Sequence, residues 1–283
     1  MKITWRGGNF QMVVIGGRQF PNMIATRPKP NRVRPIEVPA LDARSVHLWT
    51  ADVRTFRPVV RRFTRLLSAE ERKRAVRLAD PAHRMHFILA HGFLRLVLSR
   101  YLHAQPERLR FQSHANGKPR LLNATDSLCL EFNLAHSGHM TMIAIASGRS
   151  VGVDVEALTR PVRAQAIVER YFAPAERAHF ASLPRPRYEK EFILYWTAKE
   201  AVLKATGLGL AGGLSRCEVI GHPGGRSATA RLQGEGKARS WLVRFVPLSV
   251  ECLGAVAAEG TEWRVGHYQP DLRLIRRWLD ERE

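Results

Sequence analysis

The same short sequence features occur twice along the chain, always 105 residues apart. LSAEER at 67–72 is matched by FAPAER at 172–177, and Phe-Ile-Leu at 87–89 occurs again at 192–194. The extended run VHLWTADV from Val46 is matched by VGVDVEAL from Val151, and Val-Leu at 97–98 occurs again at 202–203. Four segments in one order at one spacing indicate a duplicated strand–helix–helix unit. Chance similarity is the alternative, because the identity between the two copies is low.

Local patterns predict the elements of each copy. VHLWTADV is typical of a strand, and Ser68 with Glu71 stands at capping-box spacing before a helix. Apolar residues at three- and four-residue steps predict a long helix over 83–102. A second long helix is expected over 190–206, with Gly207 as its C-terminal cap. With short β-type runs near the centre, these elements predict an α+β fold of two similar subdomains related by a pseudo-twofold axis.

We expect the two subdomains to cover residues 41–150 and 151–283. Residues 1–40 differ from both, because RPKPNRVRPIEVPA contains four prolines in a basic segment with no apolar period. Proline donates no backbone hydrogen bond and favours extended backbone before it. This segment is therefore predicted to be a flexible basic arm.

The charge balance points to an acidic partner. The 283 residues include 45 Lys and Arg against 25 Asp and Glu, a formal net charge of +20. Such an excess attracts nucleic acid, anionic lipid, nucleotides or acidic proteins. An arginine-rich solvated surface explains the same numbers, because the charge is spread along the chain.

Several protein classes are disfavoured. The longest uncharged apolar stretch, Met140–Ser147, is far shorter than the roughly 20 residues that span a bilayer. The three cysteines at 129, 217 and 252 form no CxxC pair, which argues against a disulfide framework or a structural zinc site. We expect a cytoplasmic protein that binds no membrane.

The run VGVDVE at 151–156 places two carboxylates on one face of a strand. Side chains alternate along a strand, so Gly152, Asp154 and Glu156 share the face opposite the three valines. Like charges so placed repel unless a cation bridges them, and oxygen ligands without Cys or His suit Mg²⁺. The glycine would let a ligand approach closely. The alternative is an edge strand with solvated acidic residues.

The run WTAKEAVLKATGLGL at 196–210 places Trp196, Glu200 and Lys204 on one helix face. A surface Glu–Lys pair is the plain interpretation. The neighbouring Trp196 and the apolar pair Val202-Leu203 favour a partly buried helix instead. Glu200 and Lys204 could then face the carboxylates of 151–156.

Two segments could bind an anion. Gly117-Lys118-Pro119 places a lysine on a rigid turn, which suits a phosphate, although such turns are common. FNLAHSG at 132–138 ends a β-type run with His136 between small residues. A structural role for this histidine is the alternative.

Taken together, GKP, FN-x-x-HSG, VGVDVE and WTAKEAVLKA resemble the 4′-phosphopantetheinyl transferase superfamily, in its double-length Sfp-type form. The resemblance covers roughly residues 45–215, and LSAEERKRA resembles the family's first helix motif. It implies a pseudo-dimeric α+β enzyme, in agreement with the repeat at 105 residues.

The resemblance also implies roles for individual residues. Asp154, Glu156 and Glu200 would hold Mg²⁺, with Asp154, Glu200 and Lys204 as the catalytic residues. Glu200 would act as general base on a serine hydroxyl, and Lys204 would contact the phosphates. Contacts to coenzyme A would come from Arg74, Gly117, Lys118, Pro119, Asn133, His136 and Lys204.

Two positions depart from the family pattern. Ala135 stands where the family usually has Ser or Thr, and His91 stands where many relatives have Arg. Losing one neutral hydrogen bond costs on the order of 1 kcal/mol, so we expect weaker coenzyme A binding without loss of the chemistry.

The activity implied is transfer of the 4′-phosphopantetheine arm from coenzyme A to a serine of an acidic apo acyl or peptidyl carrier protein. The reaction would need Mg²⁺ and release adenosine 3′,5′-bisphosphate, and the enzyme would be a monomer. Two alternatives are a non-catalytic basic module for nucleic acid or carrier proteins, and an Mg²⁺-dependent phosphotransferase acting on a nucleotide. The sequence has no recognisable nucleic-acid-binding motif, which counts against the first alternative. It also has no GxxxxGK[ST] loop, which counts against the second.

Overall fold

The chain divides into two compact units, Met1–Glu37 and Val38–Glu283. The computed structural model describes residues 14–15, 18–19, 38–113, 118–122, 129–158, 164–209, 213–221, 225–234 and 237–281. In the first unit, β1 (Val14–Ile15) and β2 (Arg18–Gln19) pair antiparallel. The rest of the expected arm over 1–40, except its last three residues, lies outside the described residues.

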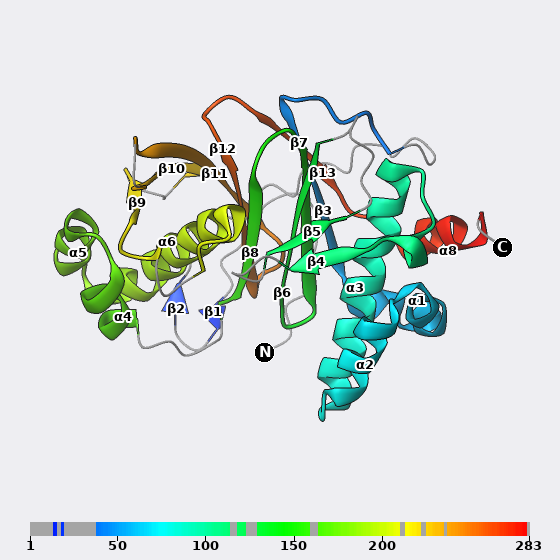
Figure 1. The fold of residues 1–283 in the computed structure, drawn as a ribbon. Coiled ribbons are helices and arrows are strands. Elements are labelled where there is room, and N and C mark those ends of the chain that lie inside the picture. The colour runs from blue at the N-terminus through cyan, green and yellow to red at the C-terminus, as the bar shows by residue number, and fades with distance from the viewer. Residues whose placement is uncertain are drawn as a thin grey trace, which may run out of the picture. The chain divides into compact units, whose positions relative to one another are not determined.

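The second unit begins with a sheet and helices that form its first half (Figure 1). A four-stranded sheet has the order β13-β3-β7-β6, and β4 and β5 form a separate hairpin. The elements are β3 (Ser45–Asp52), η1 (Val53–Val59), α1 (Val60–Leu66), α2 (Ala69–Arg77), α3 (Pro81–Leu102), η2 (Pro106–Arg108), β4 (Phe111–Ser113), β5 (Pro119–Leu121), β6 (Leu130–Ser137) and β7 (Met140–Ser147).

The second half is a five-stranded sheet with the order β8-β12-β11-β10-β9, and α6 packs against β8 and β12 (Figure 1). Two further elements, β13 and α8, end the chain. The elements are β8 (Val151–Ala157), α4 (Ala164–Tyr171), α5 (Pro174–Ala181), α6 (Arg185–Thr206), β9 (Cys217–Ile220), β10 (Ser227–Leu232), β11 (Arg239–Pro247), β12 (Cys252–Glu259), β13 (Arg264–Tyr268) and α8 (Leu272–Asp280).

The two halves repeat one topology, which confirms the predicted α+β duplication. In each half a first strand, β3 or β8, is followed by a short helix, α2 or α5, and a 22-residue helix, α3 or α6. The last strand of the repeat then pairs antiparallel with the first, β7 with β3 and β12 with β8. The predicted caps are confirmed as well: Ser68 and Glu71 form a capping box, and Gly207 ends α6 with φ of 73°.

Each half also contains an ion pair between its short helix and its long helix. In the first half, Arg95 Nε on α3 donates to Glu71 Oε2 on α2 at 2.6 Å. Arg95 Nη1 donates to the carbonyl oxygens of Pro106 (2.6 Å) and Leu109 (2.9 Å). In the second half, Lys199 on α6 contacts Glu176 on α5, 2.7 Å away. The repeated spacing of LSAEER and FAPAER therefore preserves a glutamate that joins the short helix to the long one.

An apolar layer joins the two halves. Valines of β8 and alanines and methionines of β7 form one buried cluster with residues of β3 and β12. On β6, the side-chain Oδ1 of Asn133 accepts a hydrogen bond from the backbone N–H of Val153 at 2.9 Å. Both residues are buried, so this bond fixes β8 against β6 without a backbone ladder.

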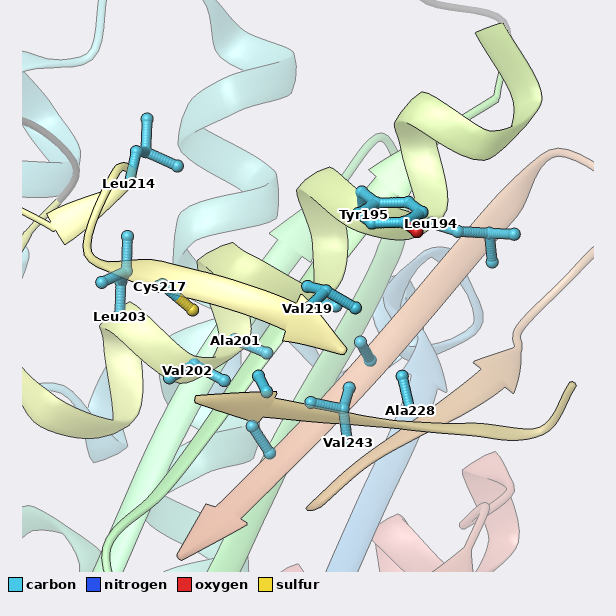
Figure 2. Close-up of a cluster of buried hydrophobic side chains, with 14 of the residues drawn as sticks. Leu194, Tyr195, Ala201, Val202, Leu203, Leu214, Cys217, Val219, Ala228 and Val243 are labelled. Atoms are coloured by element: carbon cyan, nitrogen blue, oxygen red, sulfur yellow. The ribbon is translucent and has the colours of Figure 1, made fainter. Parts of the chain in front are cut away.

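The core of the second half lies between α6 and the five-stranded sheet (Figure 2). Leu194, Ala201, Val202 and Leu203 of α6 are buried there. They meet residues of β9, β10 and β11, which include Val219, Ala228 and Val243. One face of α6 is therefore apolar and buried in this core. Polar side chains of α6 that are directed toward β8 must come from outside that face.

The end of the chain returns to the first half. β13 pairs parallel with β3, and Trp278 of α8 packs edge-on against Trp49 with ring centroids 5.5 Å apart. The indole Nε1 of Trp49 also donates to the Tyr101 hydroxyl (2.9 Å), and this hydroxyl lies 2.8 Å from His47 Nδ1. The Tyr101 hydroxyl therefore links the rings of Trp49 and His47.

We expect His47 to make folding stability depend on pH. Burial lowers the pKa of His47 from 6.5 to about 4, so between these values the unfolded chain binds the proton more readily. Stability is full above pH 6.5 and falls by on the order of 3 kcal/mol as the pH drops toward 4. Urea unfolding at pH 7 and pH 5 should show about 2 kcal/mol of this loss.

The variant His47→Asn provides the comparison. It should lose less stability between the two pH values than the parent chain, because the titrating ring is gone. Some pH dependence is expected to remain, since burial also lowers the pKa of His86 to about 4. Equal losses in variant and parent would contradict this role for His47.

Candidate active site

The side chains of β8 separate onto two faces, as the alternation predicts. Val151, Val153 and Val155 are buried in the cluster that joins the two halves. Asp154 and Glu156 leave the opposite face, toward α6. The carboxylates are thus not on a solvated strand face but in the interface between a strand and a helix.

Gly152 allows this interface to be close. A Cβ atom at this position would lie 2.1 Å from the carbonyl oxygen of Ala201 and 2.4 Å from the amide nitrogen of Ala205. The expectation that this glycine admits a ligand is therefore wrong, because the backbone of α6 occupies the space. The glycine instead brings the functional faces of β8 and α6 together.

Lys204 lies between two of the carboxylates. Its Nζ atom donates to Asp154 Oδ1 at 2.5 Å and lies 3.6 Å from Glu200 Oε2 on the preceding helical turn. The other oxygen of Asp154, Oδ2, is buried and has no hydrogen-bond partner in the described part of the chain. A buried carboxylate oxygen without a partner is costly, and a bound cation would remove that cost.

Trp196 completes the helix face. Its Nε1 donates to Glu156 Oε1 at 2.9 Å, which orients the third carboxylate. The expected alignment of Trp196, Glu200 and Lys204 on one face of α6 is confirmed, since all three are directed to the face of β8 that carries Asp154 and Glu156. Trp196 as an orienting group for Glu156 was not part of the sequence prediction.

The electrostatics of the cluster reflect burial and like charge. Burial, followed by the negative charge of Asp154, raises the pKa of Glu200 to about 7. Burial also raises the pKa of Asp154, against the lowering effect of Lys204. Burial lowers the pKa of Lys204, but the carboxylates of Asp154 and Glu200 outweigh it and the pKa is raised. One ammonium therefore leaves the negative charge of the cluster incompletely compensated.

The donor set fits a hard cation. Within the described ranges, no three or more His, Cys, Asp or Glu side chains already converge as a metal-ligand group. Asp154, Glu156 and Glu200 nevertheless supply only oxygen ligands, and Asp154 offers one oxygen that nothing in the described chain satisfies. All-carboxylate sites of this kind suit Mg²⁺.

Two predicted anion contacts lie close to this cluster. His136 is the next-to-last residue of β6, and loss of hydration, together with interactions with His91, Lys204 and Arg74, lowers its pKa. Arg74 on α2 is exposed and places its guanidinium 5.4 Å from the Phe87 ring. A phosphate bound between these groups would offset their mutual repulsion.

Lys118, the second residue of the GKP motif, lies at the C-terminal end of α6, where Ala205 follows Lys204. Lys118 Nζ donates to Glu131 Oε2 (3.0 Å) and to the carbonyl oxygen of Ala205 (2.8 Å), so the predicted phosphate ligand is engaged within the protein. Lys118 and Pro119 line a cavity of about 450 Å³, together with Phe132 and residues 205–207. Gly117, the first residue of the motif, lies outside the described residues.

The remaining predicted positions have structural partners. Asn133 holds the backbone of β8 through its side chain. Ala135 is buried in the layer between the halves, and His91 stacks on Phe87 and lies 3.3 Å from Glu71. His91 therefore contacts a glutamate of the first-half ion pair.

Two family models match consecutive parts of the chain. The first describes the N-terminal part of 4′-phosphopantetheinyl transferases and matches residues 49–148. The second describes the 4′-phosphopantetheinyl transferase superfamily and matches residues 150–253. The second match includes β8 and α6, which carry the carboxylates.

Curated relatives agree with the family models. The 4′-phosphopantetheinyl transferase HetI of Nostoc sp. is 35% identical over 220 residues, which cover 77% of this chain and 90% of the relative. The 4′-phosphopantetheinyl transferase psf-1 of Bacillus pumilus is 29% identical over 194 residues, or 69% of this chain and 76% of the relative.

We expect Gly152→Ala to separate β8 from α6. The new methyl group would overlap helix backbone that cannot rotate away, which should lower the free energy of unfolding by about 2 to 3 kcal/mol. Urea denaturation measures the change. Gly225→Ala is the matched control, because its Cβ would meet nothing within 4 Å. A Gly152→Ala variant as stable as the control would contradict the close contact.

Proposed function

Because the chain belongs to the 4′-phosphopantetheinyl transferase superfamily, we propose that it transfers the 4′-phosphopantetheine arm from coenzyme A to a serine of an apo acyl or peptidyl carrier protein. The reaction depends on Mg²⁺ and releases adenosine 3′,5′-bisphosphate. The observation that best supports this assignment is the buried group of Asp154, Glu200 and Lys204, in which Asp154 Oδ2 has no partner in the described chain.

The transfer breaks the phosphoanhydride bond of the coenzyme A pyrophosphate and forms a phosphoester bond to serine, with adenosine 3′,5′-bisphosphate as the leaving group. The serine hydroxyl oxygen forms a bond to the phosphorus that carries pantetheine, and the bond from that phosphorus to the bridging oxygen breaks. Glu200 is the proposed base that takes the serine proton. A carboxylate whose pKa is about 7 accepts a proton near neutral pH more effectively than an ordinary surface glutamate.

Lys204 and the metal compensate negative charge. The Lys204 ammonium contacts Asp154 and lies on the helix face that would meet the pyrophosphate. Mg²⁺, when held by Asp154, Glu156 and Glu200, supplies neutralisation of the charge that develops on the phosphate oxygens. Trp196 keeps Glu156 oriented toward the same place through its hydrogen bond.

The coenzyme A contacts are proposed along the junction of the two halves. Arg74 and His136 are near Lys204 and suit phosphate groups. Lys118 and Pro119 line the cavity of about 450 Å³ at the end of α6, and phosphate binding there would require Lys118 to exchange its contact with Glu131. The backbone around Gly117 and Asn133 completes the proposed set.

The partner is proposed to be an acidic carrier protein that meets a monomer in the cytoplasm. The net charge of +20 favours association with an acidic partner. The monomer is supported by the buried layer that joins two similar halves within one chain. Cys129, Cys217 and Cys252 are free thiols, as expected in a reducing compartment. Among the described helices, none combines the length and apolar character that crossing a membrane requires.

Transfer is measured directly by intact-protein mass spectrometry. Incubation with coenzyme A, Mg²⁺ and an apo acyl carrier protein should add one phosphopantetheine arm, and EDTA should abolish the gain. Addition that is undiminished by EDTA would contradict the metal requirement. If several kinds of carrier protein stay unmodified and the chain does not bind coenzyme A, the results would instead support the alternative of a non-catalytic basic module.

Variants test the carboxylates. Glu200→Gln and Asp154→Asn should each lower kcat by about 100-fold or more, because the first removes the base and the second a metal ligand. Glu262→Gln, an exposed glutamate between β12 and β13, is the matched control and should transfer at the parent rate. A folded Glu200→Gln variant with full activity would refute Glu200 as the base.

A further inference from the structure

Lys199 is a buried cation beside the proposed base. It precedes Glu200 on α6, and its side chain is 0% exposed. The Nζ atom lies 2.7 Å from Glu176 Oε2 and donates to the carbonyl oxygens of Leu214 (3.0 Å) and Cys217. An ammonium has three N–H donors, and these three acceptors satisfy them all.

Glu176 connects this lysine to two further elements. Its Oε2 accepts from the backbone N–H of Ala173 at the start of α5, and its Oε1 accepts from the backbone N–H of Val219 on β9, both at 2.8 Å. The pair of Lys199 and Glu176 therefore ties α6 to α5, to β9 and to the segment that follows α6. Apart from α6 itself, none of these elements carries a carboxylate of the proposed site.

Stability alone does not explain such a pair. Two charges removed from water gain little net free energy over well-packed apolar residues, and their better-attested use is to fix one arrangement among several. On the face toward β8, α6 is fixed by its backbone contact at Gly152. On the other side, Lys199 fixes the rotation and the axial position of the same helix.

We propose that Lys199 is a positioning residue for the transfer reaction: through its bonds to Glu176, Leu214 and Cys217 it holds α6 so that Glu200 and Lys204 meet Asp154. This inference rests on the proposed function. Successive helical residues are about 100° apart, so any turn of α6 that moved Lys199 would move Glu200 by the same angle. A shift of about 1 Å in a reacting group costs on the order of 100-fold in rate.

The first half supplies an internal control. Arg95 binds Glu71 and the carbonyl oxygens of Pro106 and Leu109 in the same way. The residue that follows Arg95 is Leu96, a fully buried apolar side chain, whereas the residue that follows Lys199 is Glu200. An ion pair of the same kind thus stabilises each of the two long helices, but only Lys199 is next to the proposed base in the sequence.

The experiment compares Lys199→Met with Arg95→Met in the full-length chain. Both variants should unfold at lower urea concentration, because Lys199→Met leaves the buried Glu176, and Arg95→Met the partly buried Glu71, without that cation. At a temperature where both are folded, Lys199→Met should lower kcat for transfer by 10- to 100-fold with an unchanged KM for coenzyme A. Arg95→Met should keep kcat within about twofold of the parent.

A double variant covers the case in which Lys199→Met does not fold. Lys199→Met with Glu176→Gln removes the unpaired charge, so stability should recover while kcat stays low. Parental kcat in the folded double variant, or an equal loss of kcat in Arg95→Met, would overturn the positioning role. Failure of the parent chain to transfer the arm would refute the proposed function instead, so the two results are distinguishable.

Discussion

The contact between the backbones of α6 and β8 at Gly152 determines where every group of the candidate site lies. Because no side chain intervenes there, carboxylates on the strand and on the helix come within reach of one ammonium group, that of Lys204. The closeness also buries them, which raises the pKa of Glu200 to about 7. One packing constraint therefore produces both the geometry and the charge imbalance that the proposed chemistry uses.

Duplication explains why the site is found in one half. Both halves place a strand beside a long helix and anchor that helix by an ion pair to the short helix, Arg95 with Glu71 or Lys199 with Glu176. In the first half, aromatic rings from β3, α3, β13 and α8 fill the region around Trp49, which corresponds in the repeat to Asp154. The first half is thus closed by apolar packing, whereas the second half retains carboxylates.

The repeated spacing and the strand alternation were sufficient to predict the duplicated α+β fold and the shared face of Asp154 and Glu156. They did not reveal that Gly152 meets a helix, because residues 49 positions apart come together only through tertiary packing. Lys199 was missed although Glu176 lies inside the repeated motif, since nothing in a helical sequence tells a buried lysine from a solvated one. The pairing of β13 with β3 could not be predicted either, because the two strands are distant in the sequence and no local pattern indicates that they pair.

The most direct measurement is Mn²⁺ binding, followed by electron paramagnetic resonance, as a substitute for Mg²⁺. If Asp154, Glu156 and Glu200 form the cation site, the parent chain with coenzyme A binds one Mn²⁺ ion, and Asp154→Asn weakens that binding at least tenfold. Binding of Mn²⁺ with equal affinity by parent and variant would contradict the assignment of these carboxylates.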